Sequence, residues 1–254
     1  MGSIVAIATE KGGSTKTTLA LHLAWKAKGR ALLVDLDSQA NATRVLLKNQ
    51  LPESGHVGHV LLRHVSANEI ILKGAGGVDL LPSHPELAGA LQLLNGELGP
   101  ERRLSQVLAT IALNYEIVVL DCAPGRSTTF IGALLAANRV VSPIVPDLFG
   151  AYGLAGLLEL LGAVRRDLGG SCEFAGAIAS RVTRTKMAGE IVAQLKNDLG
   201  PKLLGIVPDS VKVGEALAAN LPTWEHAPGS PAAEALGMAC DAVLAGLKEC
   251  KNAA

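Results

Sequence analysis

The stretch Lys11-Gly12-Gly13-Ser14-Thr15-Lys16-Thr17-Thr18 decides the fold of this chain. It directly follows a short apolar run, Ile4–Ala8, and it leads into a stretch of helical character, Thr17–Lys28. Glycines let successive backbone N–H groups point inward, and the start of a following helix adds its partial positive charge, so such a loop forms a cradle for phosphate. In that cradle Lys16 would reach the β- and γ-phosphates, and the Thr17 hydroxyl would bind Mg²⁺.

Short apolar runs alternate with helical stretches along the whole chain. The expected strands are Ile4–Ala8, Ala31–Val34, Val78–Leu81, Ile117–Leu120, Val140–Val145, Phe174–Ile178 and Leu203–Val207. The expected helices are Thr17–Lys28, Leu87–Leu94, Leu104–Ala112, Gly153–Asp167, Ala188–Leu199 and Pro231–Lys248. Continuously apolar strands are typical of parallel sheets covered on both faces. We therefore predict one α/β domain over residues 1–254, with a doubly wound, mostly parallel sheet.

Composition excludes several classes of protein. The chain has 23 Lys+Arg and 23 Asp+Glu, so its net charge indicates no partner. With 49% hydrophobic residues it is not disordered, and its four scattered cysteines form neither a disulfide framework nor a Cys-x-x-Cys metal site. No window approaches the ~18 consecutive apolar residues of a membrane span, so a cytoplasmic protein is expected.

The segment from Asn49 to Gly77 is the least regular part of the chain. We expect it to be a surface excursion within the single domain. It carries His56, His59 and His64, whose spacing matches no standard metal site and which no carboxylate pattern completes. The sequence therefore favours histidines without a metal-binding role over metal ligands here.

Carboxylates follow two of the expected strands. Asp35 and Asp37 come at the end of the second strand, and Asp121 comes at the end of the fourth. Ligand sites of doubly wound folds lie at the carboxyl ends of strands, where a carboxylate can hold Mg²⁺ and its water shell. A single aspartate there is commonly a helix cap or a turn former. Together with the phosphate loop, however, the three carboxylates indicate a nucleotide site.

These motifs resemble the ParA/MinD family of deviant Walker A ATPases, whose signature is K-G-G-x-G-K-[ST]-T, then D-x-D-x-Q, then a hydrophobic strand ending in D-x-x-P. Three further segments resemble the family in collinear order: residues 78–83, 138–146 followed by Gly153-Leu154, and 206–216. The resemblance thus covers nearly the whole chain. It implies a P-loop NTPase fold, ATP and Mg²⁺ as cofactors, and a homodimer that forms on ATP binding.

The resemblance also implies roles for individual residues. Lys11 matches the deviant lysine that reaches the partner's phosphates across a dimer interface, and Lys16 matches the lysine of the loop itself. Asp37 matches the aspartate that orients the attacking water, and Asp121 matches the Walker B carboxylate. Pro208 sits where the backbone receives adenine. The residues implied to bind nucleotide are Gly12, Gly13, Ser14, Thr15, Lys16, Thr17, Thr18 and Pro208, and those implied to hold the metal are Thr17, Asp37 and Asp121.

Two residues depart from the family pattern. Thr15 stands where both this family and the general P-loop pattern have glycine before the lysine. If the backbone needs a positive φ there, a β-branched residue is strained, and nucleotide affinity or turnover falls. Asp209 stands where a basic residue is usual, which removes one expected DNA contact.

The branch of the family is read from charge. The segment from Arg181 to Lys212 contains six basic and three acidic residues. The resemblance implies non-specific DNA binding through Arg184, Lys186 and Lys212. The Ala/Leu-rich stretch 231–254 lacks the basic amphipathic pattern of a membrane-binding helix, so no membrane partner is expected. Because the first strand begins by Ile4, no preceding operator-binding module is expected.

We therefore expect a weak ATPase of the ParA type, associated with the nucleoid and stimulated by a ParB-like centromere-binding or adaptor protein, for DNA partition or cargo positioning. The alternatives are a MinD-like positioning ATPase and a nucleotide-gated binder with little hydrolysis.

Overall fold

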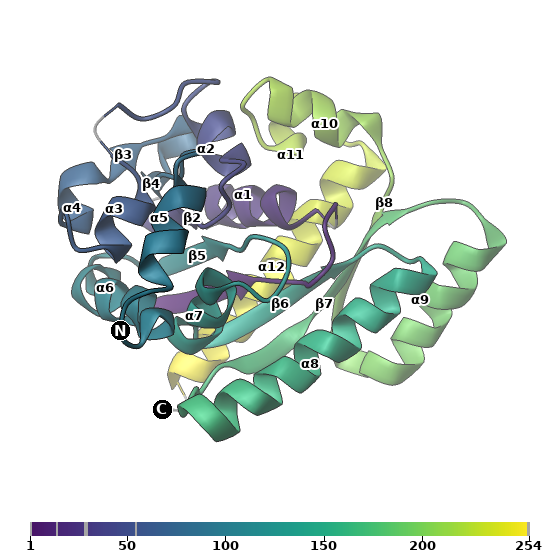
Figure 1. Cartoon of the computed structure of the whole chain (residues 1–254). Helices are drawn as coiled ribbons and strands as arrows, with labels where there is room; N and C mark the ends of the chain where they lie inside the picture. Colours follow the sequence, from purple (N-terminus) through teal and green to yellow (C-terminus); the bar gives the residue numbers. More distant parts are fainter. Residues whose placement is uncertain (1, 14, 28–29, 54, 253–254) are drawn as a thin grey trace.

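The computed structural model describes residues 2–13, 15–27, 30–53 and 55–252. An eight-stranded sheet forms its centre (Figure 1). The strands are β1 (Ser3–Ile7), β2 (Ala31–Asp35), β3 (Leu72–Lys73), β4 (Asp79–Leu81), β5 (Ile117–Asp121), β6 (Arg139–Ile144), β7 (Glu173–Val182) and β8 (Leu203–Pro208). Their spatial order is β3-β4-β2-β5-β1-β6-β7-β8, and every pairing is parallel except that of β3 with β4. The predicted doubly wound, mostly parallel sheet is confirmed.

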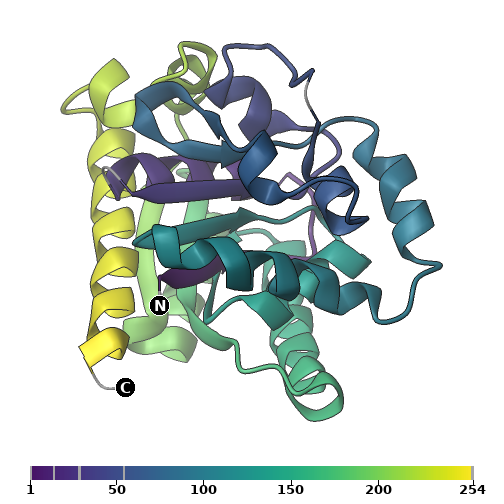
Figure 2. The same ribbon diagram turned by 90° about the vertical axis from the view of Figure 1, so that its left-hand side faces the viewer.

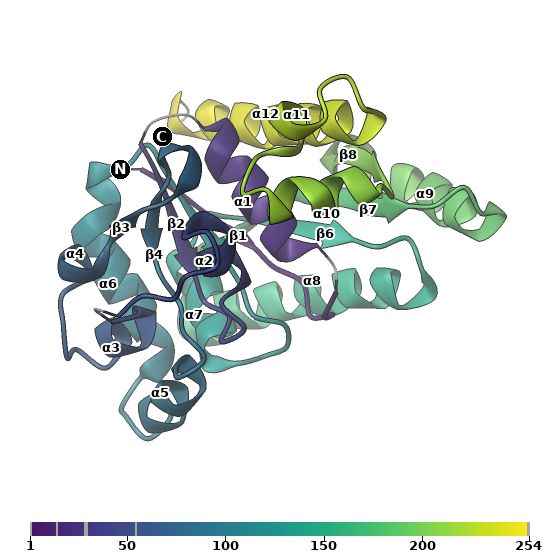
Figure 3. The ribbon, with the colours of Figure 1, turned by 90° about the horizontal axis from the view of Figure 1, so that it is seen from above.

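Helices cover both faces of this sheet, as Figure 3 shows from above. On one face lie α1 (Lys16–Lys26), α2 (Asn41–Leu46), α10 (Val211–Ala218), α11 (Thr223–His226) and α12 (Pro231–Asn252). On the other lie α3 (Val57–Leu61), α4 (Ala67–Ile70), α5 (Leu87–Leu94), α6 (Arg103–Ile111), α7 (Thr128–Ala136), α8 (Leu148–Leu168) and α9 (Lys186–Leu199). None of the described helices is both long and apolar enough to cross a membrane.

Alternation along the strands builds a core on each face. In β1, Val5 and Ile7 pack with helix α1, whereas Ile4 and Ala6 pack with α6 and α7 on the opposite side. Because successive strand residues point to opposite faces, both of which are covered, all five residues of β1 are buried, and the four from Ile4 to Ile7 are apolar. α12 runs beside α1 and β8 (Figure 2) and buries Leu236 and Val243 against them.

The segment 49–77 differs from the expected surface excursion. Its residues Val57, Val60 and Leu61 recur at helical spacing, form α3, and are buried in the core together with Ile70 of α4. The part before α3 lines an open hollow with β3, and Arg63, His64, Asn68 and Glu69 are also exposed. The sequence pattern was missed because these helices are only four and five residues long.

The strand register positions the functional site. Ile7 of β1 and Asp35 of β2 are both paired with Asp121 of β5, so these three strands end level with one another. The loop after β1 and the carboxylates of β2 and β5 therefore meet at one edge of the sheet.

Candidate functional site

The loop between β1 and α1 has the backbone that the sequence predicts for a phosphate cradle. Gly13 has a φ of 71°, and a Cβ added at Gly12 or Gly13 would meet no atom within 4 Å, so the loop is open on that side. Thr15 has a φ of 66° and a ψ of 21°, in the left-handed region, and directly precedes α1. The position before Lys16 thus has the positive φ that glycine adopts easily and that strains a β-branched residue such as threonine. Ser14 lies outside the described residues.

Lys16 is turned into the loop instead of toward solvent. Its side chain is buried, and its Nζ donates a hydrogen bond of 3.1 Å to the carbonyl oxygen of Lys11. Burial lowers the pKa of Lys16, while the nearby carboxylates of Asp121 and Asp37 raise it. A cation held in this way is ready to exchange a carbonyl for a phosphate oxygen.

Asp121 ends β5 with a fully buried carboxyl group. Neither of its oxygens has a well-formed hydrogen bond within the described parts of the chain. Burial, followed by the charge of Asp35, raises the pKa of Asp121 well above its ordinary value, although the Thr17 hydroxyl and the Lys16 ammonium act in the opposite direction. A buried carboxylate without partners is costly, and a divalent cation is one group that would satisfy it.

Asp35 is held quite differently from Asp121. Its oxygens accept hydrogen bonds from the Thr43 hydroxyl at 2.7 Å, the Thr43 N–H at 2.9 Å and the Asp37 N–H at 3.1 Å. Burial raises the pKa of Asp35 to about 6 in spite of these donors. Because the donors favour its ionised form, Asp121 is the member of the pair that takes up a proton. Asp35 thus acts as a support for the start of α2, not as a ligand.

Asp37 is half-buried on the segment between β2 and α2. Its Oδ1 accepts a hydrogen bond from the Gln39 N–H at 3.0 Å, and its carbonyl oxygen accepts one from the Ser83 hydroxyl at 2.7 Å. The Ser83 N–H in turn donates to the Thr43 hydroxyl at 2.9 Å. Sequence analysis assigned no role to Thr43 or Ser83. Each is a polar residue in the segment that follows a strand, but only the structure shows that it is buried.

Lys11 forms an ion pair with a residue from a distant part of the chain. Its Nζ is 2.5 Å from Oδ2 of Asp147, the residue that caps the first turn of α8 by accepting a hydrogen bond from the Gly150 N–H. Both side chains are about one-third exposed, at 32% and 33%. In the single chain, therefore, Lys11 makes an internal ion pair at the rim of the site.

A cavity of about 180 Å³ adjoins the loop. Thr15 and Thr18 line one side of it, and Pro208, Val213 and Leu217 line the other. The predicted adenine residue, Pro208, thus lies on the same cavity as the end of the phosphate loop. The mixed apolar and hydroxyl lining suits a flat heteroaromatic ring.

The three predicted DNA-contacting residues lie at the ends of β7 and β8. Arg184 is exposed in the turn before α9, Lys186 is the first residue of α9, and Lys212 lies in the first turn of α10. Val182 pairs with Pro208, which brings the two turns together. Among the described residues Arg184 has no ion pair, whereas Lys186 lies 3.7 Å from Glu190 and Lys212 lies 2.8 Å from Glu215.

Asp209 adds a further acidic contact to this face. Its Oδ1 is 3.2 Å from Nε of Arg181, so it neutralises a cation that the sequence count had included. The count of six basic and three acidic residues already includes Asp209, but Glu215, which pairs with Lys212, lies outside it, so Arg184 is the most available cation of this face.

The strain at Thr15 is testable. Thr15→Gly is expected to stabilise the nucleotide-free protein by about 0.5–1 kcal/mol in urea unfolding, because relief of a left-handed L-residue exceeds the entropy cost of glycine. Thr15→Ala is the control, since it keeps the Cβ and should gain little. Equal gains from both substitutions would assign the effect to the hydroxyl group and not to φ.

The buried carboxyl of Asp121 makes stability depend on pH. Because its pKa is raised by folding, its contribution is favourable at low pH and is lost as pH rises above the unfolded value of 3.8. Asp121→Asn should therefore stabilise the nucleotide-free protein, with an advantage that widens by up to about 1.4 kcal/mol per pH unit as pH rises from 3.8 toward the raised folded-state pKa. Thermal unfolding across this range measures it. An exposed control, Asp198→Asn, should show a flat difference, and a flat difference for Asp121→Asn would contradict the assignment.

Comparison with known proteins agrees with this geometry. The model of the AAA domain family matches residues 2–173. The chromosome-partitioning ATPase Soj of Thermus thermophilus is 34% identical over 250 residues, which cover 96% of each chain.

Solved structures share the fold over nearly its whole length. Apo McdA from Cyanothece has a TM-score of 0.86 at 21% identity and covers 96% of this chain and 100% of its own. Cobyrinic acid a,c-diamide synthase from Mycobacterium smegmatis, with bound ADP and magnesium, has a TM-score of 0.82 at 25% identity and covers 98% of this chain and 96% of its own. With its phosphate loop, its level strand ends and its similarity to Soj, the chain belongs to the ParA/MinD family of P-loop ATPases.

Proposed function

We propose that the chain is a ParA-type ATPase that binds Mg²⁺ and ATP, dimerises in the ATP-bound state, and as a dimer binds DNA without sequence preference. The observation that carries this proposal is the buried carboxyl group of Asp121, which lies beside Lys16 and Thr17 and accepts no well-formed hydrogen bond within the described parts of the chain. Such a group is costly in the free chain and is satisfied by a metal–nucleotide complex. The similarity to Soj supports a role in partitioning DNA or positioning another cargo.

The residues present fit both cofactors. The Thr17 hydroxyl and the Asp121 carboxylate would hold Mg²⁺ with Asp37 beside them, and the bound ion supplies positive charge to the phosphates. The backbone of Gly12, Gly13 and Thr15 and the Lys16 ammonium would bind the phosphates. Asp37 would orient the attacking water, because Ser83 and Gln39 fix its segment. The cavity at Pro208 would receive the base.

Lys11 would make dimerisation depend on ATP. Its ammonium would leave Asp147 and bind the triphosphate held by the partner, so that an internal ion pair is exchanged for one between protomers. Hydrolysis would remove the phosphate that stabilises the contact between protomers, and dimerisation would therefore switch between two states.

Lys11→Ala separates nucleotide binding from dimerisation. The variant should keep ATP affinity within a few-fold, because Lys16 remains, and should lose the dimer formed with a non-hydrolysable ATP analogue in sedimentation velocity. Lys16→Ala is the contrasting variant and should lose nucleotide binding itself. A dimer that persists in Lys11→Ala would assign Lys11 to its own protomer only.

The basic face at the ends of β7 and β8 would hold DNA. Arg184, Lys186 and Lys212 offer few phosphate contacts per protomer. Lys186 and Lys212 each also form an ion pair with a glutamate. Joining two such faces in a dimer makes the second contact intramolecular, so binding should require ATP.

A salt titration on random-sequence duplex tests the DNA face. Arg184→Ala should lower affinity equally for all sequences and should reduce the log–log salt slope by about one unit per protomer, two per dimer. Arg166→Ala is a matched control, because it is also an exposed arginine but lies in the last turn of α8. Equal binding with ATP and ADP, or an unchanged slope in Arg184→Ala, would place the DNA site elsewhere.

A nucleotide-gated binder is the second candidate, and the left-handed Thr15 favours it. A loop strained at the phosphate site could bind ATP and dimerise while turning over slowly. Comparison of ATP turnover with ATP-induced dimerisation distinguishes the two.

For the active ATPase we further propose a ParB-like or adaptor protein as activator and a place on the nucleoid in the cytoplasm. The buried face of α12 argues against a MinD-like membrane cycle, because Leu236, Val243 and Leu247 are already packed in the core.

A further inference from the structure

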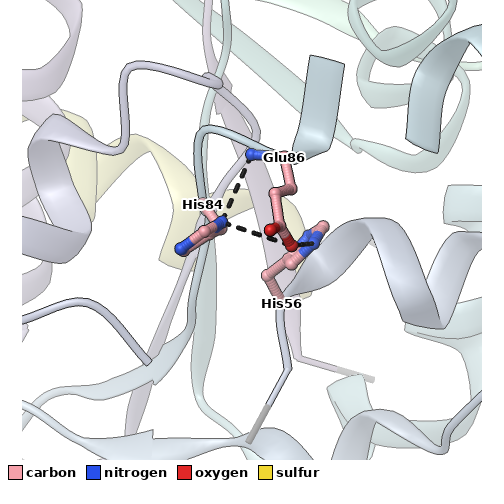
Figure 4. Close-up of side chains that lie close together, drawn as sticks. All are labelled: His56, His84 and Glu86. Atoms are coloured by element: carbon pink, nitrogen blue, oxygen red, sulfur yellow. Dashed lines mark hydrogen bonds and ion pairs between the residues drawn. The ribbon is translucent and has the colours of Figure 1, made fainter. Parts of the chain in front are cut away.

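Two histidines and a glutamate converge beside the loop that follows β4 (Figure 4). His56 precedes α3, His84 lies in the loop after β4, and Glu86 directly precedes α5. Oε2 of Glu86 is 4.0 Å from Nε2 of His56 and 3.7 Å from Nδ1 of His84. The two rings stack with centroids 5.5 Å apart and planes 20° from parallel. The sequence reading singled out His56 but had no reason to join it to residues almost thirty positions later.

We propose that His56, His84 and Glu86 form a binding site for a divalent transition metal ion of the zinc class. Two imidazoles and a carboxylate are a zinc donor set that leaves a fourth position for water. The three candidate ligand atoms lie within 4.8 Å of one another. Tetrahedral ligands at about 2.0–2.2 Å from zinc are about 3.4 Å apart, so the site closes by a small contraction. The Glu86 oxygen is already 4.0 Å and 3.7 Å from the two imidazole nitrogens, so the larger contraction is between His56, which is buried, and His84, whose side chain is 24% exposed and can move.

The hydrogen bonds show how each ring would bind. Nδ1 of His84 accepts a hydrogen bond of 3.2 Å from the Glu86 N–H, so the ring proton of neutral His84 lies on Nε2, and a metal bound at Nδ1 would have to displace that N–H. Nδ1 of His56 accepts one of 3.1 Å from the Gly58 N–H, so the ring proton of neutral His56 lies on Nε2. Binding through Nε2 moves that proton to Nδ1 and breaks the bond to Gly58. Metal binding therefore loosens the cap of α3, and the affinity is lower than that of a preformed site.

The site is connected to the segment that carries Asp37. The Val57 N–H donates to the carbonyl oxygen of Pro82 at 2.8 Å, and the Ser83 hydroxyl donates to the carbonyl oxygen of Asp37 at 2.7 Å. A metal joining His56 to His84 would fix the 82–84 loop against α3. An effect on turnover through Asp37 rests on the proposed function, whereas metal binding itself does not.

Zinc binding to the full chain tests the proposal. After treatment with a chelator, the protein is titrated with Zn²⁺ alone in competition with a chromophoric chelator. One zinc per chain is expected, with affinity lowered at least tenfold in Glu86→Gln and in His84→Ala. His226→Ala is the matched control, because Nε2 of His226 also lies near a glutamate, 3.5 Å from Glu215, but forms no cluster of three ligands with other residues that the structure describes. It should bind zinc as the parent does.

Thermal unfolding provides the second readout. Zinc should raise the melting temperature of the parent chain and of His226→Ala but not that of Glu86→Gln, whose substituted side chain is too exposed to affect folding. No zinc uptake by the parent, or unchanged affinity in both Glu86→Gln and His84→Ala, would overturn the proposal. ATP turnover is measured separately with and without zinc, so that an inactive ATPase leaves the metal result intact.

Discussion

The level ends of β1, β2 and β5 are the constraint on which the rest of the structure depends. Their register places the buried carboxyl of Asp121 against Lys16 and Thr17 of the loop that follows β1. The free chain tolerates an unsatisfied buried acid there, because the surrounding sheet and helices hold it in place. The burial of this acid lowers the stability of the free chain, and a bound ligand would remove that cost. Locally unfavourable groups of this kind are commonly found at functional sites.

A second layer of hydrogen bonds fixes the geometry around this acid. Asp35 is bound to Thr43, Thr43 to Ser83, and Ser83 to Asp37, so the ends of β2 and β4 are tied to one segment. Asp35 and Asp121 lie side by side but differ in their donors, which leaves Asp35 as a support and Asp121 as the group open to a ligand. Two neighbouring carboxylates thus acquire distinct roles from their surroundings alone.

Much of the fold and of the nucleotide site follows from the sequence. The continuously apolar strands predict the parallel sheet, and the loop with Lys16 after the first strand, together with Asp37 and Asp121 after the second and fourth predicted strands, predicts the edge of the sheet where they meet. Contacts between distant segments could not be predicted in this way, because the spacing of apolar residues along the sequence carries information about local structure only. His56 with His84, Lys11 with Asp147, and Arg181 with Asp209 are all of this kind. The short helix α3 was missed for a different reason, since five residues carry too little periodicity.

The register of the central strands also determines where the chain can change length. Adding or removing one residue in β1 or β5 would turn every following side chain to the opposite face and put Leu120 or Cys122 where Asp121 now meets the loop. The stretch between α2 and α3 borders an open hollow and contributes no strand to the centre of the sheet, so it has room for extra residues. Insertions and deletions among natural variants should therefore gather between residues 47 and 53 and be absent from the strands that end at the nucleotide site.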